Sequence, residues 1–185
     1  MTTDKPIVLK RDCRAAIIPS GEGLSLAAGS KVWLTQALGG TFTVMTDHGY
    51  SVRIDGQDGD ALGLEAEQLS AALSGASSAT GGSIEDRVWQ QLRTCFDPEI
   101  PVNIVELGLI YDCRVDIIAP ERHRAVVRFT LTSPGCGMGQ FLREDIRKKL
   151  LAISGVVEAD VELVWEPAWN QSMISPGAKQ QLGIV

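Results

Sequence analysis

A run of small side chains divides this chain into two parts, each of which must fold around its own core. Residues 75–83 read Gly-Ala-Ser-Ser-Ala-Thr-Gly-Gly-Ser. A segment without large apolar side chains has nothing to bury and behaves as a flexible linker. The chain has 185 residues, which leaves room for one small domain on each side. We therefore expect domains at residues 1–74 and 84–185, joined by the linker 75–83.

The first part has the sequence pattern of half-buried strands. Three short segments alternate apolar and polar side chains, and the pairs Gly39-Gly40 and His48-Gly49 lie where tight turns would connect them. The alternation predicts a small all-β domain, followed by a turn and a short helix. The three segments are residues 31–37, 41–46 and 50–54, and the turn and helix are expected within residues 60–73.

The periodicity changes after the linker. Ser83 is a good helix N-cap, and apolar residues then recur at helical spacing until Pro98 stops the pattern. Alternating strands and a second amphipathic helix follow. This order, α-β-β-α-β, predicts an α+β fold with helices on one face of a small sheet, and an irregular tail after residue 165. Strands are expected at residues 104–118, 125–132 and 157–165, and the second helix at residues 137–153.

Charge and cysteine spacing exclude several classes of function. The net charge is −6 and is negative on both sides of Ser74, so we expect no nucleic-acid or anionic-membrane partner. No apolar run approaches the roughly 18 residues that span a bilayer, and the N-terminus lacks a signal-peptide core, so a cytoplasmic location is expected. The four cysteines are widely spaced without a Cys-x-x-Cys pair, which argues against a disulfide framework or a zinc site.

The strongest candidate for chemistry is Cys136, which lies among glycines between a predicted strand and a predicted helix. Unpaired N–H groups and the helix dipole at a helix start lower the pKa of a thiol. The resulting thiolate binds soft metals and attacks persulfides or disulfides. Two alternatives stay open. The cysteine could be incidental to a glycine-rich turn, or the loop could hold phosphate, although Gly135-x-Gly137-x-Gly139 lacks the P-loop lysine and the dinucleotide spacing.

Two further segments each allow a functional and a structural interpretation. Asp97 and Glu99 follow the first helix in a proline-stiffened loop. Such a loop can place a carboxylate near a site, or it can simply end a helix with solvated acids. The tail contains Trp165, Trp169 and Met173. These side chains could form a docking patch for client proteins, or the tail could wrap around its own domain and bury them.

Four motifs in order resemble the PaaD-like family of iron–sulfur assembly factors, over about residues 84–185. The N-terminal half, with Arg11-Asp-Cys and Thr35-Gln-Ala-Leu-Gly-Gly, looks like the extra domain of the SufT-type members. The four motifs are Asp97-Pro-Glu-Ile-Pro, Leu107-Gly-Leu-Ile-Tyr-Asp, Thr130-Leu-Thr-Ser-Pro-Gly-Cys-Gly-Met and Trp165-Glu-Pro-Ala-Trp-Asn-Gln-Ser-Met.

The resemblance implies an auxiliary, non-enzymatic role in maturing iron–sulfur proteins and a fold related to the C-terminal domain of NifU-type scaffolds. It implies a transient iron–sulfur cluster or iron as cargo, no nucleotide, and iron–sulfur carriers, scaffolds and client apoproteins as partners. Many family members have Cys-Pro where this chain has Cys-Gly, and NifU-type scaffolds carry a Cys-x-x-Cys pair that is absent here. The implied site consists of Cys136, the acids Asp97 and Glu99, and the hydroxyls of Thr132 and Ser133.

A lone exposed cysteine limits the mechanism, because an iron–sulfur cluster normally takes four protein ligands. We therefore expect either a homodimer that shares a labile cluster or an adaptor in which Cys136 acts transiently. Two alternatives remain. In a pure interaction adaptor Cys136 would be passive. In a thiol enzyme Cys136 would be the nucleophile, assisted by Asp97 or Glu99, although no histidine is placed to act as its base.

Overall fold

The chain divides into two compact units, Met1–Ser77 and Ser78–Val185, and each has its own hydrophobic core. Residues 75–81 of the predicted linker lie outside the described residues, so the domain boundaries expected from the sequence stay a prediction. Each unit is described by itself. The computed structural model describes residues 5–64, 82–97, 99–134 and 137–184.

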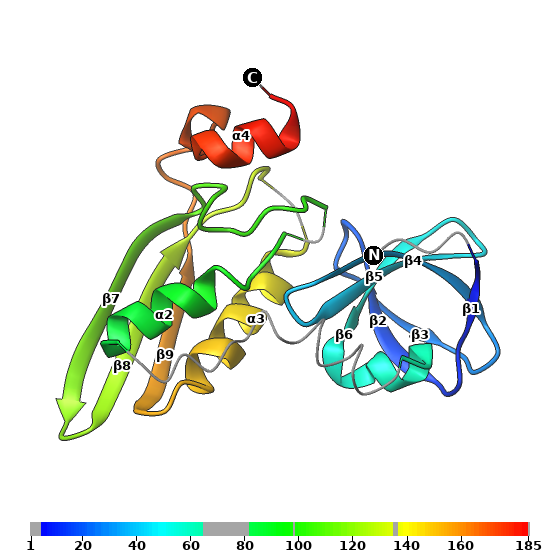
Figure 1. The fold of residues 1–185 in the computed structure, drawn as a ribbon, viewed down its shortest axis with the longest axis horizontal. Coiled ribbons are helices and arrows are strands. Elements are labelled where there is room, and N and C mark those ends of the chain that lie inside the picture. Colours follow the sequence, from blue (N-terminus) through cyan, green and yellow to red (C-terminus); the bar gives the residue numbers. More distant parts are fainter. Residues whose placement is uncertain (1–4, 65–81, 98, 135–136, 185) are drawn as a thin grey trace. The chain divides into compact units, whose positions relative to one another are not determined.

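The first unit is built on one antiparallel sheet with the strand order β1-β4-β5-β6-β2-β3 (Figure 1). Strands β4, β5 and β6 start and end within one residue of the ranges expected from the alternation. The strands are β1 (Ile7–Val8), β2 (Cys13–Ile17), β3 (Gly23–Leu26), β4 (Lys31–Leu38), β5 (Thr41–Thr46) and β6 (Ser51–Asp55), and the 3-10 helix η1 (Gly56–Leu62) follows them.

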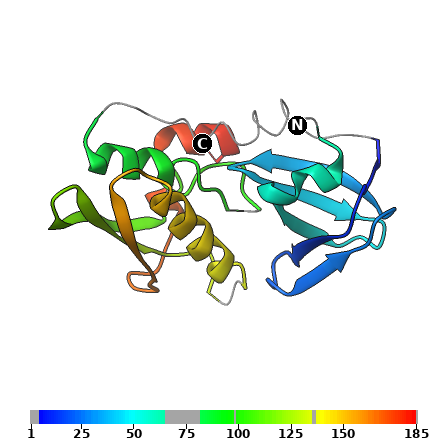
Figure 2. The same cartoon turned by 90° about the horizontal axis from the view of Figure 1, so that it is seen from below.

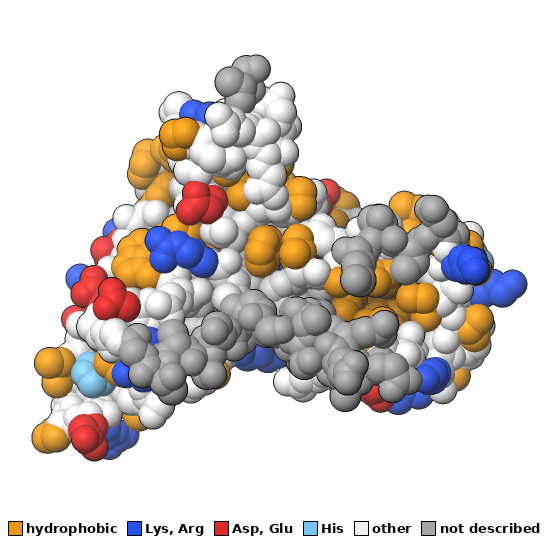
Figure 3. Space-filling view, in the orientation of Figure 1, with side chains coloured by type: hydrophobic (Ala, Val, Ile, Leu, Met, Phe, Trp, Pro, Cys, Tyr) orange, Lys and Arg blue, Asp and Glu red, His pale blue; other side chains and the backbone are white. Residues whose placement is uncertain are grey.

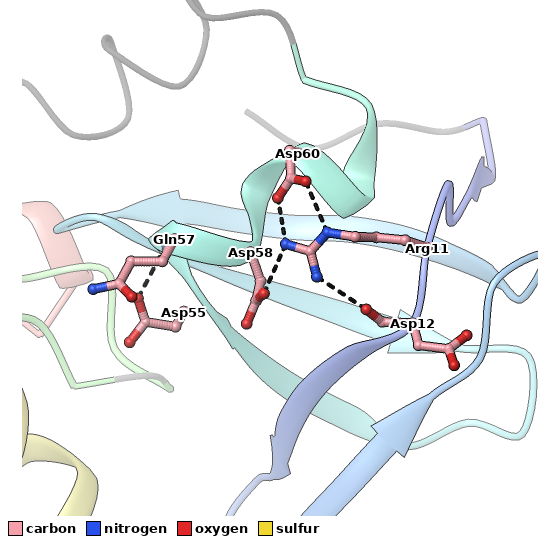
Figure 4. A network of polar contacts seen from close by, with 6 residues as sticks. All are labelled: Arg11, Asp12, Asp55, Gln57, Asp58 and Asp60. Atoms are coloured by element: carbon pink, nitrogen blue, oxygen red, sulfur yellow. Dashed lines mark hydrogen bonds and ion pairs between the residues drawn. The ribbon is translucent and has the colours of Figure 1, made fainter.

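Alternation along these strands builds the core of the first unit. Phe42 and Val44 of β5 pair with Ile54 and Val52 of β6, and all four side chains are fully buried on the same face. On the surface, Arg11 binds the carboxylates of Asp58 and Asp60, which belong to η1 (Figure 4). Exposed ion pairs of this kind contribute little to stability, so the apolar face of the sheet holds this unit together.

The second unit is a three-stranded sheet with the order β7-β8-β9, in which β7 and β8 form a hairpin and β9 runs parallel to β8. Helix α3 connects the parallel pair. Figures 1 and 2 show α2 and α3 side by side on one face of the sheet. The elements are α2 (Ile84–Leu92), β7 (Ile110–Ala119), β8 (Arg122–Phe129), α3 (Gly139–Leu151), β9 (Val156–Leu163), the 3-10 helix η2 (Gln171–Met173) and α4 (Pro176–Leu182).

Helix α3 fills the space over the sheet with one apolar stripe. Leu142, Ile146 and Leu150 are buried at four-residue spacing, which places them on one helix face. On a neighbouring face, the Lys149 ammonium donates to the Thr94 carbonyl at 2.8 Å and to the Asp145 carboxylate at 2.9 Å. This contact ties α3 to the C-terminal end of α2. The sequence-based expectation of an α+β protein is confirmed.

Two expectations about this unit are wrong. Residues 104–109 do not extend β7, because Gly108 adopts a left-handed φ of 70° and breaks the strand geometry. The tail is not wholly irregular, because Ser175 caps α4, Pro176 occupies its first turn and Gly183 ends it.

No described helix is long and apolar enough to cross a membrane. Figure 3 shows apolar side chains at the tip of the β7–β8 hairpin, where Ile117 is 77% exposed.

Candidate functional site

The segment that carries Cys136 is the connection from β8 to α3 in a parallel β-α-β crossover. In such a crossover the connection after the first strand lies at the carboxyl end of the parallel pair, beside the start of the helix, where α/β sheets commonly bind ligands. The helix starts very close to the strand ends. A Cβ added to Gly139 would lie 3.0 Å from a methyl carbon of Leu163 and 3.1 Å from one of Leu131. A small residue at position 139 therefore keeps this helix start against the sheet.

Gly135 and Cys136 themselves lie outside the described residues, so the predicted role of Cys136 stays a prediction. The residues that lead into the segment are progressively more exposed. Thr130 is 1% exposed, Thr132 is half-buried and Ser133 is exposed. Of the two residues expected to supply hydroxyls, Thr132 is therefore half-buried and Ser133 is exposed.

The two predicted acids differ in their surroundings. Asp97 is 5% exposed, and one of its carboxylate oxygens accepts a hydrogen bond from the Glu99 N–H at 2.9 Å. Glu99 is exposed. The picture of two solvated acids after a helix is therefore wrong for Asp97, whose carboxylate shapes the loop from inside, while Glu99 remains accessible.

Hydrogen bonds connect the stretch between α2 and β7, residues 93–109, to the stretch between β8 and α3, residues 130–138. We call these two stretches the acid segment and the thiol segment. An isolated bridge pairs Phe96 with Asn103, and the Ile104 N–H donates to the Cys95 carbonyl at 3.0 Å. The Thr130 N–H donates to the Leu109 carbonyl at 2.9 Å. This bond joins the end of the acid segment to the beginning of the thiol segment.

The C-terminal tail holds the same acid segment from outside. The Trp169 indole N–H donates to the Leu107 carbonyl at 2.8 Å, and the Ser175 N–H donates to the Glu106 carbonyl at 2.8 Å. The Gln181 side-chain amide donates to the Pro101 carbonyl at 3.1 Å. The interpretation in which the tail wraps around its own domain describes these contacts, but their partners were not predicted from the sequence, although the Ser-Pro cap of α4 was a signal that the tail is ordered. We call these three contacts the tail clamp.

The aromatic residues of the tail do not share one environment. Trp169 is half-buried by the contact just described, and the Tyr111 hydroxyl donates to the Pro167 carbonyl at 2.7 Å and contacts the Met173 sulfur at 3.8 Å. Trp165 is 43% exposed. Of the three predicted docking residues, Trp165 alone is largely accessible, and client docking stays a prediction for all three.

The three described cysteines have the surroundings of structural residues. Cys13 and Cys95 are buried, and the Cys95 thiol donates to the Gln91 carbonyl at 3.6 Å. Burial, assisted by the nearby charges of Glu85 and Asp112, raises the pKa of the Cys113 thiol to about 12. Burial also raises the pKa of the Cys13 thiol, and a raised pKa disfavours the reactive thiolate near neutral pH. Within the described ranges, no group of three or more His, Cys, Asp or Glu residues is arranged to hold a metal ion.

Comparison with known proteins identifies the family. Residues 85–161 match the model of the family described as iron–sulfur cluster assembly protein. The chain is 42% identical over 101 residues to an Fe-S protein maturation auxiliary factor of Porphyromonas gingivalis, covering 55% of this chain and 92% of that protein. It is 38% identical over 88 residues to the Fe-S protein maturation auxiliary factor SufT of Staphylococcus aureus, covering 48% and 96%.

A crystal structure of a domain of unknown function from Bacillus anthracis is similar to part of this chain. It superposes with a TM-score of 0.50 at 38% sequence identity and covers 55% of this chain and 93% of that one. The part of the present chain that the family model matches contains α2, the β7–β8 hairpin, the thiol segment and α3. This chain belongs to the family of iron–sulfur cluster assembly proteins and is of the SufT type.

Proposed function

We propose that this protein is an auxiliary factor that assembles iron–sulfur clusters or delivers them to client apoproteins, with Cys136 as the thiolate that contacts the cluster or iron transiently. The observation that supports the proposal is the parallel β8–α3–β9 crossover, because residue 136 belongs in sequence to the connection between β8 and α3, and connections of this kind commonly carry binding sites. A thiol at the start of a helix is favoured as a thiolate, and thiolates are the ligands of iron–sulfur clusters.

The residues around the proposed site favour an open site on a fixed loop rather than a closed cage of four cluster ligands. The second unit is proposed to be a PaaD-like domain of α-β-β-α-β order. Thr132 and Ser133 would supply accessible hydroxyls beside Cys136. Asp97 would fix the acid segment from inside, while Glu99 faces solvent. Because a single cysteine at the site leaves cluster ligands missing, we propose that two copies share a labile cluster and hand it from carrier or scaffold proteins to clients.

Anaerobic reconstitution with iron and sulfide tests the proposal. Wild-type protein is expected to develop visible absorbance and to retain about half a cluster per chain, because a cluster needs about four ligands and would bridge two copies. Cys136→Ser is expected to lose both signals. Cys113→Ser is the matched control, since it also removes one thiol, but one whose pKa is raised to about 12 by burial.

Two results would contradict the proposal. If the wild-type protein binds no iron, the cluster does not contact this chain. If Cys113→Ser and Cys136→Ser lose iron equally, the thiol segment is not the site. Sedimentation of the reconstituted protein checks whether the cluster-loaded form is a dimer.

An adaptor that brings carriers and clients together without holding the cluster is the second candidate. The observation that favours it is the 43% exposure of Trp165 on the tail, because exposed aromatic side chains often anchor protein interfaces. In that case Cys136→Ser would still support client maturation in a reconstituted transfer assay, whereas Trp165→Ala would reduce it.

A further inference from the structure

The outer edge of β9 carries backbone hydrogen-bonding groups that have no role in the proposed function. Strand β9 is the last strand of the three-stranded sheet, and no described strand pairs with its outer side (Figure 1). The Arg143 guanidinium donates to the Val161 carbonyl at 2.8 Å, so this carbonyl points away from β8. Because backbone groups of alternate residues face the same side of a strand, the backbone groups of Ala159 and Leu163 point to that edge as well.

A groove of about 750 Å³ runs along this edge between α3 and β9. Its described walls are Gln140, Arg143, Glu144 and Arg147 of α3 and residues 159–163 of β9, together with Val126. The space beside the edge is thus open enough to hold a further strand. The Arg143 side chain takes the position that a backbone N–H of such a strand would occupy, and a flexible arginine can move aside.

The sheet face opposite α2 and α3 (Figures 1 and 2), which we call the outer face, carries charges that select which strand can pair with the β9 edge. Strand β8 presents Arg124 and Arg128, and β9 presents Glu158, Asp160 and Glu162 on the same face. Arg124 contacts Glu158 at 2.6 Å and Asp160 at 3.6 Å, and Arg128 contacts Glu162 at 3.0 Å. Charge therefore alternates from a basic strand to an acidic strand, and the next strand outward meets a row of carboxylates.

A second copy of this chain does not fit that row. Antiparallel pairing of two β9 strands would place carboxylates opposite carboxylates, which is destabilising. The other edge of the sheet is also less suitable. Strand β7 carries Arg114 between Asp112 and Asp116, so its charges do not form a row of one sign. Its register with β8 shifts near both ends, and such bulges protect an edge from pairing.

We infer that the β9 edge binds an extended segment of a partner protein that carries Lys or Arg at alternate positions, as an added strand of the sheet. Backbone hydrogen bonds to the edge would supply affinity, and the carboxylates of Glu158, Asp160 and Glu162 would select the basic side chains. Residues between the basic ones would face the groove beside α3. This inference does not rest on Cys136, so Cys136→Ser is expected to bind the segment as the wild-type chain does.

A fluorescent peptide that alternates lysine with valine tests the inference, with anisotropy as the readout on the full chain. A peptide of the same composition with its lysines in one block keeps the charge and loses the strand pattern. We expect the alternating peptide to bind and the block peptide to bind at least about tenfold more weakly, because only alternation puts every lysine on the acidic face. Equal binding of the two peptides would overturn the inference, as would no binding of either.

Two matched pairs of variants place the peptide. Asp160→Lys is expected to weaken binding about tenfold by setting like charges opposite each other. Asp116→Lys makes the same change of charge beside the same Arg124, but on the far edge strand, and is expected to leave binding unchanged. Arg143→Gln frees the Val161 carbonyl and is expected to bind more tightly than Arg147→Gln, which alters the charge equally.

Other outcomes have equally clear meanings. If Asp160→Lys and Asp116→Lys weaken binding equally, the peptide recognises net charge and the inference fails. If the unliganded chain self-associates in sedimentation and Asp160→Lys changes that association, a second copy occupies the edge and the inference also fails.

Discussion

The two units of this protein use hydrogen bonds in different ways. In the first unit, six strands joined by short connections satisfy one another along the sheet. In the second unit, residues 93–109 lie between α2 and β7, and their described part has one β-bridge, between Phe96 and Asn103, beside hydrogen bonds within turns. A segment of this kind has few ladder bonds, so its backbone groups need partners from elsewhere.

The tail clamp supplies those partners. Its bonds to the carbonyls of Pro101, Glu106 and Leu107 hold the acid segment against its own domain. Binding sites are usually placed on loops that a rigid scaffold positions. The two units therefore differ in what holds them: the tail holds the irregular segment of the second unit in one conformation, whereas the first unit is held by the hydrogen bonds of its own sheet.

The largest expected loss of stability comes from deleting a buried aromatic ring in the core of either unit. Phe129→Ala and Phe42→Ala each delete a fully buried ring, one in each unit, at a cost of about 3–5 kcal/mol in the free energy of unfolding. Urea unfolding followed by NMR should show each variant destabilising its own unit. A Phe42→Ala variant that unfolds the second unit to the same extent would mean that the two cores form one cooperative system.

A side chain at position 108 is expected to push the tail away from residues 104–109 and so to loosen the tail clamp. A Cβ there would lie 2.3 Å from the Met173 carbonyl oxygen, at a φ of 70°. We expect Gly108→Ala to cost more than about 2 kcal/mol and to speed amide exchange over residues 104–109. Gly183→Ala is the control, because its φ is 68° but no atom lies within 4 Å of the added Cβ, so only about 1 kcal/mol of backbone strain is expected. Equal effects of the two substitutions would argue against the close contact.

Regular alternation made much of the fold predictable from sequence. Strand β5 occupies the expected residues 41–46, and the helix expected from the Ser83 cap begins at Ile84. These signals are local, since side-chain period and capping depend on neighbours in sequence. The same rules misread residues 104–109, where buried Leu107 and Leu109 alternate as in a strand. Burial there comes from packing of a turn under the tail, and periodicity does not distinguish the two cases.

The candidate site was predictable in its residue types but not in its arrangement. The glycine-flanked Cys136 pointed to a strand–helix connection, and the chain does pass from β8 to α3 there. The burial of Asp97 and the tail clamp depend on contacts between residues far apart in sequence, such as Trp169 with Leu107. Local patterns carry no information on such contacts, so the sequence favoured a tail packed on its own domain over a docking surface but did not identify the residues that the tail would contact.

The contribution of the tail clamp can be measured one bond at a time. Trp169→Phe keeps the aromatic packing and removes the N–H that donates to the Leu107 carbonyl. A hydrogen bond of this kind contributes about 1 kcal/mol, so we expect that loss in urea unfolding, with faster amide exchange near Leu107. Trp165→Phe is the control, since that side chain is 43% exposed. If both variants are as stable as the wild type, the tail does not brace the acid segment.

The smallest expected effect is a pH dependence at the start of the second unit. The Ser83 N–H and hydroxyl donate to the Asp86 carboxylate at 3.0 Å and 2.9 Å, and these bonds lower the pKa of Asp86 below its usual value. A carboxyl group with a lowered pKa stabilises the fold fully above its ordinary pKa of about 3.9, and this contribution is lost as the pH falls through the lowered pKa. The amides of the first turn of α2 should therefore exchange faster as the pH falls below about 4, beyond the intrinsic pH dependence of exchange. Asp86→Ala should remove this change, whereas Glu85→Ala, which removes a carboxylate from the same turn, should retain it. An Asp86→Ala variant with the wild-type pH profile would show that the capping box does not contribute to the stability of the helix start.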